Sequence, residues 1–231
     1  MSRNRGPTAT PSVTTPAVLL YLHGFGSGPS SFKARTLAER FAASGVQLDV
    51  PDLTPGHDGF ERSSPSSMLA VAERLLAGAP PPHAIIGSSL GGYLAAVAAS
   101  RDPTIERLVL LAPAFRVFER WDRKLTRAER EEWSARGREV FHHASGRNRR
   151  LGWQFHEDAK GWPSLPDVRV PTLCIAGRRD ETVPLEDVAA FVARTPTARM
   201  LEVDDGHELA LSLDRIFEEA RAFLGASGLV E

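Results

Sequence analysis

The sequence contains one cysteine, Cys174, among its 231 residues, which excludes an internal disulfide and gives no sign of an oxidising compartment. It also lacks any apolar run of the ~18 residues that would indicate a membrane-spanning helix. Charge of one sign is not in excess: 28 Lys and Arg residues face 29 Asp and Glu residues, for a formal net charge of −1. No global field therefore attracts nucleic acid or an anionic membrane, and we predict neither a nucleic-acid partner nor membrane insertion. The sequence carries no signal for an oligomeric state.

The rest of the composition, 42% hydrophobic and 25% charged, is typical of a single globular domain. Residues 1–16, MSRNRGPTATPSVTTP, are rich in Pro, Thr and Ser and lack the apolar core of a secretory signal. An acid-free start with Arg and Ser/Thr also fits an organelle transit peptide, but we favour a disordered tail. We therefore predict a tail over residues 1–16, one folded domain over 17–231, and a cytoplasmic location by default.

Short apolar runs alternate with helical patterns along most of the chain. Strands are expected at residues 17–22, 46–50, 83–86, 107–111, 172–176 and 199–203, and helices at 30–44, 65–78, 89–100, 185–194 and 209–224. Such alternation predicts an α/β protein with a mostly parallel sheet and helices on both faces. The rhythm breaks at about residues 115–166, a charged stretch that is helical in places and free of convincing strands. We interpret this stretch as a helical cap, or lid, inserted into the sheet.

Residues 87–91, GSSLG, match the pattern G-x-S-x-G with Ser89 at its centre. The motif follows an apolar strand and opens a helix, so Ser89 is expected at a sharp turn that lifts its hydroxyl clear of the sheet. The alternative, that this serine only caps a helix, is weakened by suitable partners later in the chain. Ser89 is our candidate nucleophile.

A serine hydroxyl needs a base, which in this arrangement is a histidine late in the chain, after a carboxylate. His207 follows the expected strand 199–203 and is preceded by Gly206. Asp180 follows the strand 172–176. It therefore lies at the carboxyl ends of the strands, where the sites of open parallel sheets form. Its rivals as the orienting acid are Glu181, Asp204 and Asp205. Asp180 could instead form an ion pair with a neighbouring arginine or serve only as a turn residue.

The oxyanion of an acyl-transfer intermediate needs N–H donors, one after the nucleophile and one from the loop after an early strand. We expect these donors to be the backbone N–H groups of Leu90 and Phe25, the latter in the loop HGFG at residues 23–26. A phosphate-binding role for this loop is set aside, because neither G-x-G-x-x-G nor a P-loop lysine is present.

Taken together, these residues resemble the α/β-hydrolase superfamily from residue 17 to 224. The segments YLHGFGSGP and IIGSSLGGYLA are more specifically similar to those of small YqiA-like esterases. The strand-to-helix turn that carries Ser89, called the nucleophile elbow, is also similar to that of the mitochondrial acyl-protein thioesterase and acyl-glucuronide esterase. The resemblance implies hydrolysis of carboxylic esters or thioesters, with Ser89, Asp180 and His207 at the positions of the family's triad. It departs from the minimal esterase in the long Trp-rich stretch.

We thus predict a serine hydrolase acting on a small-molecule ester or thioester through an acyl-enzyme, with no cofactor and no metal. All tryptophans fall within the inserted stretch, and we expect them to line a substrate pocket: Trp121, Trp133, Trp153 and Trp162. The alternative is that a small cap needs aromatic residues to fold. An amidase or peptidase of the same fold and a non-catalytic binding protein also stay open, whereas dehalogenases and epoxide hydrolases normally carry Asp at the elbow.

Overall fold

The centre of the molecule is a five-stranded sheet, seen in a computed structural model that describes residues 18–225. The strands are β1 (Leu19–Leu22), β2 (His83–Ser88), β3 (Ile105–Leu111), β6 (Thr172–Gly177) and β7 (Ala198–Val203). They lie in the order β1-β2-β3-β6-β7, and every neighbouring pair is parallel. The predicted tail over residues 1–16 lies outside the described residues.

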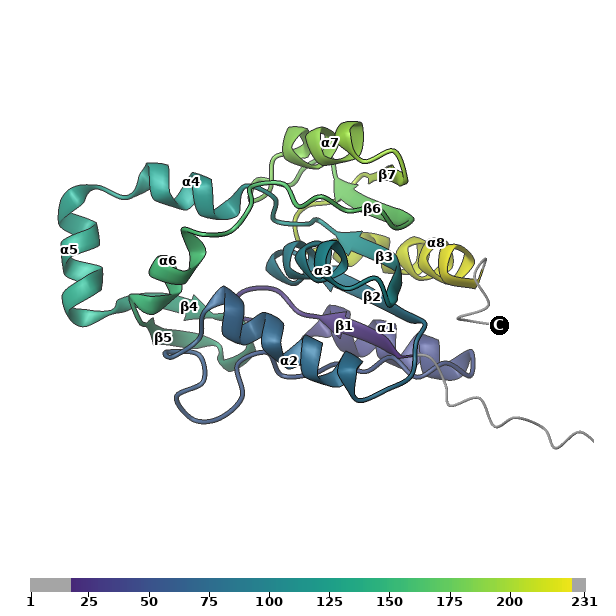
Figure 1. Cartoon of the computed structure of the whole chain (residues 1–231), viewed down its shortest axis with the longest axis horizontal. Coiled ribbons are helices and arrows are strands. Elements are labelled where there is room, and N and C mark those ends of the chain that lie inside the picture. Colours follow the sequence, from purple (N-terminus) through teal and green to yellow (C-terminus); the bar gives the residue numbers. More distant parts are fainter. Residues whose placement is uncertain (1–17, 226–231) are drawn as a thin grey trace, which may run out of the picture.

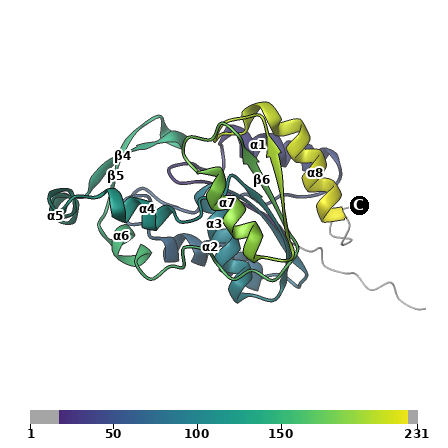
Figure 2. The ribbon, with the colours of Figure 1, turned by 90° about the horizontal axis from the view of Figure 1, so that it is seen from above.

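Helices cover both faces of this sheet, as predicted (Figure 2). One face packs against α2 (Pro65–Ala77), α3 (Leu90–Arg101) and α7 (Leu185–Arg194), and the other against α1 (Phe32–Ala43) and α8 (Leu213–Gly225). Leu20 and Leu22 of β1 point into the first core, while Leu19 and Tyr21 point into the second. Both sets of side chains are apolar because both faces are buried, which explains the continuous apolar runs in the sequence.

Within residues 18–225, no helix has the length and apolar character needed to cross a membrane.

The strand expected at residues 46–50 is wrong, because this segment makes a single bridge to β1. The N–H of Tyr21 donates to the carbonyl of Asp49 at 2.7 Å, and the N–H of Asp49 donates to the carbonyl of Leu19 at 2.9 Å. The pairing ends there, since Pro51 follows within two residues and has no N–H to continue a ladder. The segment therefore runs beside the edge of the sheet without becoming part of it.

The stretch between β3 and β6 contains two strands, so the expectation of a strand-free insertion is also wrong. It folds as α4 (Val117–Lys124), α5 (Arg127–Arg136), the antiparallel hairpin of β4 (Arg138–His142) and β5 (Arg147–Leu151), the hairpin's 3-10 turn η1 (His143–Ser145), and α6 (Gln154–Ala159). The strand sequences REVFH and RNRRL are largely solvent-exposed, so they lack the apolar alternation that marks a strand. Figure 1 shows these elements standing off one end of the sheet.

The helix expected at residues 209–224 begins later than predicted. A 3-10 turn, η2 (Ala210–Ser212), comes first, and α8 starts at Leu213. Leu209 has a φ of 53°, a left-handed conformation that a regular helix excludes.

Candidate active site

Ser89 stands at the turn between β2 and α3, with φ of 54° and ψ of −119°. A side chain other than glycine is strained in this region of backbone space. Hydrogen bonds hold the strained residue in place: its N–H donates to the carbonyl of Leu111 at 2.9 Å, and its carbonyl accepts from the N–H groups of Tyr93 (3.1 Å) and Ala114 (3.0 Å). The turn is thus fixed to β3 and to its own helix, and Ser89 lines a cavity at this end of the sheet.

Glycines at this elbow allow a very close approach of backbones. A Cβ on Gly91 would lie 2.1 Å from the carbonyl oxygen of Leu22, and one on Gly87 would lie 2.5 Å from that of Gly91. Neither position has room for a side chain, so both glycines of the motif are required by packing. The motif brings the first turn of α3 against the end of β1, where the expected oxyanion loop begins.

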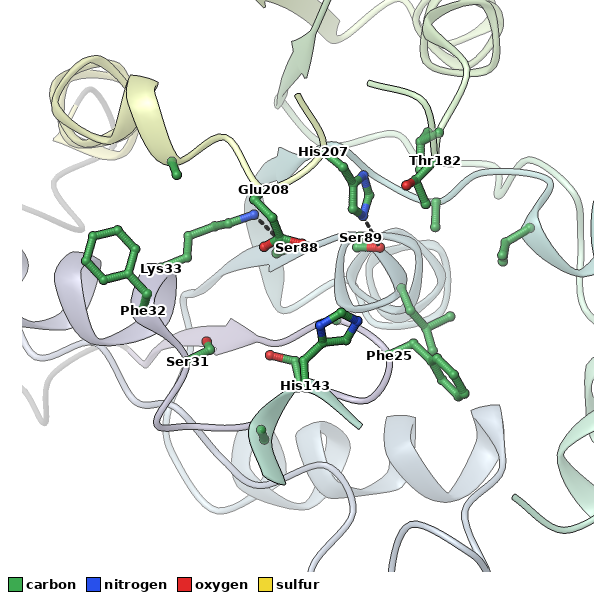
Figure 3. A pocket seen from close by; sticks show the side chains of 18 of the residues that line it. Phe25, Ser31, Phe32, Lys33, Ser88, Ser89, His143, Thr182, His207 and Glu208 are labelled. Carbon is green, nitrogen blue, oxygen red and sulfur yellow. Dashed lines mark hydrogen bonds between the residues drawn. The ribbon is translucent and has the colours of Figure 1, made fainter. Parts of the chain in front are cut away.

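The structure brings Ser89, His207 and Asp180 together (Figure 3 shows the first two). The Nε2 atom of His207 lies 3.0 Å from Oγ of Ser89, and its Nδ1 lies 2.8 Å from Oδ2 of Asp180. Each residue follows a different strand: Ser89 follows β2, Asp180 follows β6 and His207 follows β7. With the proton on Nδ1, the imidazole donates to the carboxylate and presents a lone pair to the serine hydroxyl.

Asp180 is suited to remain ionised. Burial alone would raise the pKa of its carboxyl, but the hydrogen bond from His207 and the backbone N–H groups of Val183 and Thr182 outweigh burial and lower that pKa. Both N–H groups donate to Oδ1 at 2.8 Å, which leaves Oδ2 for the imidazole.

The rival acids have other contacts. Asp205 is buried and accepts from the N–H groups of Gly206 (2.8 Å) and Leu211 (2.9 Å), so it shapes the loop that carries His207. Asp204 pairs with Arg179 on the surface. No hydrogen bond links either of them to the imidazole of His207 within the described part of the chain.

The expected oxyanion loop is held by a buried histidine. The N–H of Leu53 donates to Nε2 of His23 at 3.1 Å, so Nδ1 carries the proton and donates to the carbonyl of Gly24 at 3.0 Å. Burial lowers the pKa of His23 and keeps it neutral in this role. Phe25 and Leu90 both line the cavity, and Leu90, as the first residue of α3, has no intrahelical acceptor for its N–H. The sequence analysis placed His23 in the expected oxyanion loop and missed this supporting role.

A cavity of about 890 Å³ opens at Ser89, between the sheet edge and the inserted elements. On one side of Ser89 the cavity is lined by aromatic side chains: Phe25 packs edge-on to Trp121, with ring centroids 5.3 Å apart. On the other side, the labelled side chains in Figure 3 are largely polar, among them Lys33, Ser88 and Glu208. We call these two regions the aromatic arm and the polar arm.

Of the tryptophans expected to line the pocket, Trp121 does so and the others do not. Trp133 is 3% exposed and donates its Nε1–H to the carbonyl of Leu151 at 2.9 Å. Trp153 stacks on His156 with ring centroids 4.2 Å apart, and Trp162 packs near Tyr93. The inserted elements stand off the sheet, and these side chains extend the apolar core of one sheet face into them.

Lys33 is a cavity residue that sequence reasoning missed. It is 8% exposed, and its Nζ donates to Oγ of Ser88 at 3.1 Å. It stands one helical turn before Leu37 and two before Phe41, on the buried face of α1. A lysine on an otherwise apolar helix face is the signal that could have found it.

The sequence matches the model of an uncharacterised protein family, UPF0227, over residues 18–224. The chain belongs to this family. A pimeloyl-[acyl-carrier protein] methyl ester esterase of Xanthomonas campestris pv. campestris is 30% identical, over 91% of this chain and 96% of the relative. These matches confirm the resemblance to YqiA-like esterases.

Solved structures show the same fold for this UPF0227 member. Est1E from Butyrivibrio proteoclasticus, with ferulic acid bound, superposes with a TM-score of 0.78 at 18% identity and covers 92% of this chain and 90% of its own. Mouse alpha/beta hydrolase domain-containing protein 10 gives 0.74 at 18% identity, over 90% and 89%. The predicted α/β-hydrolase fold is thus confirmed.

Proposed function

We propose that this chain is a serine hydrolase in which Ser89 is the nucleophile, His207 the general base and acid, and Asp180 the orienting acid. The observation that supports this most directly is the hydrogen-bond chain from Ser89 Oγ (3.0 Å) through His207 to Asp180 (2.8 Å) at the mouth of a cavity. A serine, a histidine and a buried carboxylate in this order are the parts of an acyl-transfer site.

The bond that it cleaves is a carboxylic ester. The chain is an ester hydrolase on the evidence of its fold and its esterase relatives, and its substrate is a small-molecule ester. Thioesters, which the same acyl transfer cleaves, are part of the proposal. The substrate named for the relatives, a pimeloyl-[acyl-carrier protein] methyl ester, is carried on a protein and is a further candidate beside small-molecule esters.

The reaction then runs in two steps. His207 Nε2 takes the proton of Ser89 as Oγ attacks the ester carbonyl, and the imidazolium gives that proton to the leaving oxygen as the C–O bond breaks. Water, deprotonated by His207, next releases the acyl group from Ser89. Ionised Asp180 holds the imidazole in the required tautomer and stabilises its charged form.

We assign the N–H groups of Phe25 and Leu90 as the donors that stabilise the negative charge on the carbonyl oxygen. Both residues line the cavity beside Ser89, and Gly24 lies so close that a Cβ on it would be 3.2 Å from that of Ser89. Removing one donor of this kind typically costs about 2.7–4 kcal/mol of transition-state stabilisation.

The test is hydrolysis of p-nitrophenyl esters of increasing acyl length by wild type, Ser89→Ala and Ser88→Ala, together with labelling by a fluorophosphonate probe. We expect Ser89→Ala to lose labelling and to lose activity by about 10⁴-fold or more, whereas Ser88→Ala keeps its labelling. A wild type that neither hydrolyses esters nor reacts with the probe would overturn the proposal in favour of a binding protein. Faster cleavage of matched p-nitroanilides would favour an amidase.

The cytoplasmic location stays a prediction from the sequence, and fractionation of cells producing the full chain would test it.

A further inference from the structure

The polar arm contains a buried lysine that is not fully paired. Lys33 is 8% exposed, and an ammonium has three N–H donors, of which the structure uses one on Ser88. Among residues 18–225, no carboxylate lies within 4.0 Å of its Nζ. Burying an ammonium without partners is unfavourable, so an acceptor from the substrate would complete the site.

The groups around Lys33 provide both donors and an acceptor. Figure 3 shows Lys33 reaching from α1, and Glu208 from the loop after β7, towards Ser88 on the same side of Ser89. Tyr21 and Ser88 line the same cavity. Phe25 and the aromatic arm lie on the other side of Ser89 (Figure 3).

The charges nearby favour a neutral ligand over an anion. Burial lowers the pKa of Lys33, and Glu208, Asp180 and Asp205 act in the opposite direction through their negative charge. Three carboxylates thus act on Lys33 through their charge, and Glu208, which lines this side of the cavity, would repel an anionic ligand group placed beside Lys33. An apolar group would leave the free N–H donors of Lys33 without an acceptor.

We propose that the polar arm binds a hydroxyl group on the alcohol portion of the ester, with Lys33 donating to it and Glu208 accepting from it. The inference rests on the proposed function, because it is His207 that protonates the leaving oxygen. The alcohol portion leaves beside His207, and Figure 3 shows Glu208 on the side of Ser89 and His207 that faces Lys33, so we assign the alcohol portion to the polar arm. The preferred substrate class is then an ester of a short hydroxylated alcohol whose acyl chain fills the aromatic arm.

The experiment compares two esters of the same size, 2-hydroxyethyl butyrate and propyl butyrate, in which a hydroxyl replaces a methyl group. The ratio of their kcat/KM values is measured for wild type and for Lys33→Met, so the intrinsic reactivity of each ester cancels. We expect the ratio to fall by about tenfold or more in Lys33→Met, as for the loss of a hydrogen bond to a charged group. Lys124→Met is the matched control, since Lys124 lines the same cavity from α4, and its ratio should equal that of wild type.

A second variant keeps the inference testable if Lys33→Met does not fold. Glu208 is solvent-exposed, and Glu208→Gln removes its charge with little change in the shape of the side chain. In Glu208→Gln, the kcat/KM of the anionic ester carboxymethyl butyrate should rise relative to that of 2-hydroxyethyl butyrate. This ratio staying at its wild-type value would count against the inference as much as an unchanged ratio in Lys33→Met.

The possible failures are distinguishable. Unchanged ratios in enzymes that still react with a fluorophosphonate at Ser89 overturn the polar-arm inference and leave the serine hydrolase standing. A Lys33→Met effect confined to the pair propyl 3-hydroxybutyrate and propyl butyrate overturns the assignment to the alcohol side. Absence of labelling in wild type overturns the proposed function and this inference with it.

Discussion

The Nε2 atom of His207 lies 3.0 Å from Oγ of Ser89, although 118 positions separate the two residues in the chain. The parallel sheet produces this contact. Ser89 follows β2 and His207 follows β7. In a parallel sheet the carboxyl ends of all strands lie on the same side, so the two residues lie close together. Asp180, after β6, completes the group because β6 pairs with β7.

Strain at Ser89 predicts that the elbow costs stability. Its φ of 54° and ψ of −119° are unfavourable for any residue with a Cβ, but not for glycine. Ser89→Gly should therefore be more stable than Ser89→Ala by about 1 kcal/mol, even though both lack the hydroxyl. Urea unfolding of the two variants gives the difference, and a less stable glycine variant would show that the turn is not strained.

The contacts of Asp180 predict an effect on kcat, and its lowered pKa predicts a dependence of stability on pH. Asp180→Asn should lower kcat by about 10⁴-fold, because the amide favours the wrong tautomer of His207. Ionised Asp180 stabilises the fold above the usual carboxyl pKa of about 3.9, and this contribution is lost as pH falls through the lowered folded-state pKa. The stability difference between wild type and Asp180→Asn should then be largest near pH 7 and shrink below pH ~4.

Urea unfolding at pH 7 and at about pH 3 measures that difference. The neighbour Glu181 is exposed, and Glu181→Gln is the control: its kcat should change by less than about tenfold, and its stability difference should not depend on pH in this way. An equal loss of kcat in both variants would transfer the orienting role away from Asp180.

The sequence predicted the elements whose pattern is local and repeated. Ser89 and Asp180 could be found because each follows an apolar strand, and His207 because it follows a predicted strand late in the chain. The order of the three along the chain is itself a signal. The hairpin β4–β5 could not, since its mostly exposed strands carry charges that any loop could carry. Lys33 was missed because a lone lysine on a helix is normally solvated, and its burial depends on tertiary packing of α1 against the site.

The tryptophans show the same limit and give a paired prediction. Nothing in the sequence separates Trp121, which lines the cavity, from Trp133, which is buried in the core of the inserted elements. Trp133→Ala should lower the free energy of unfolding by about 3–5 kcal/mol through a cavity and a lost hydrogen bond to Leu151.

Trp121→Ala should instead change acyl-chain preference, since it removes a wall of the aromatic arm, with a smaller loss of stability. The two readouts are the kcat/KM profile over p-nitrophenyl esters and the urea midpoint, measured for both variants. A change of chain-length preference in Trp133→Ala at unchanged stability would reverse the two assignments.

The close approach of Gly91 to β1 predicts a severe effect from one methyl group. A Cβ there would lie 2.1 Å from the carbonyl oxygen of Leu22 and 2.5 Å from that of His23, and backbone atoms cannot swing away as a flexible side chain can. Gly91→Ala should therefore lower the free energy of unfolding by about 1–3 kcal/mol or more. It should also reduce activity, because α3 can accommodate the methyl only by moving away from β1 and from the loop that presents Phe25.

Gly161→Ala is the control, since nothing lies within 4 Å of a Cβ at that position. A Gly91→Ala enzyme with the stability of Gly161→Ala would show that the elbow tolerates a wider separation of β1 and α3.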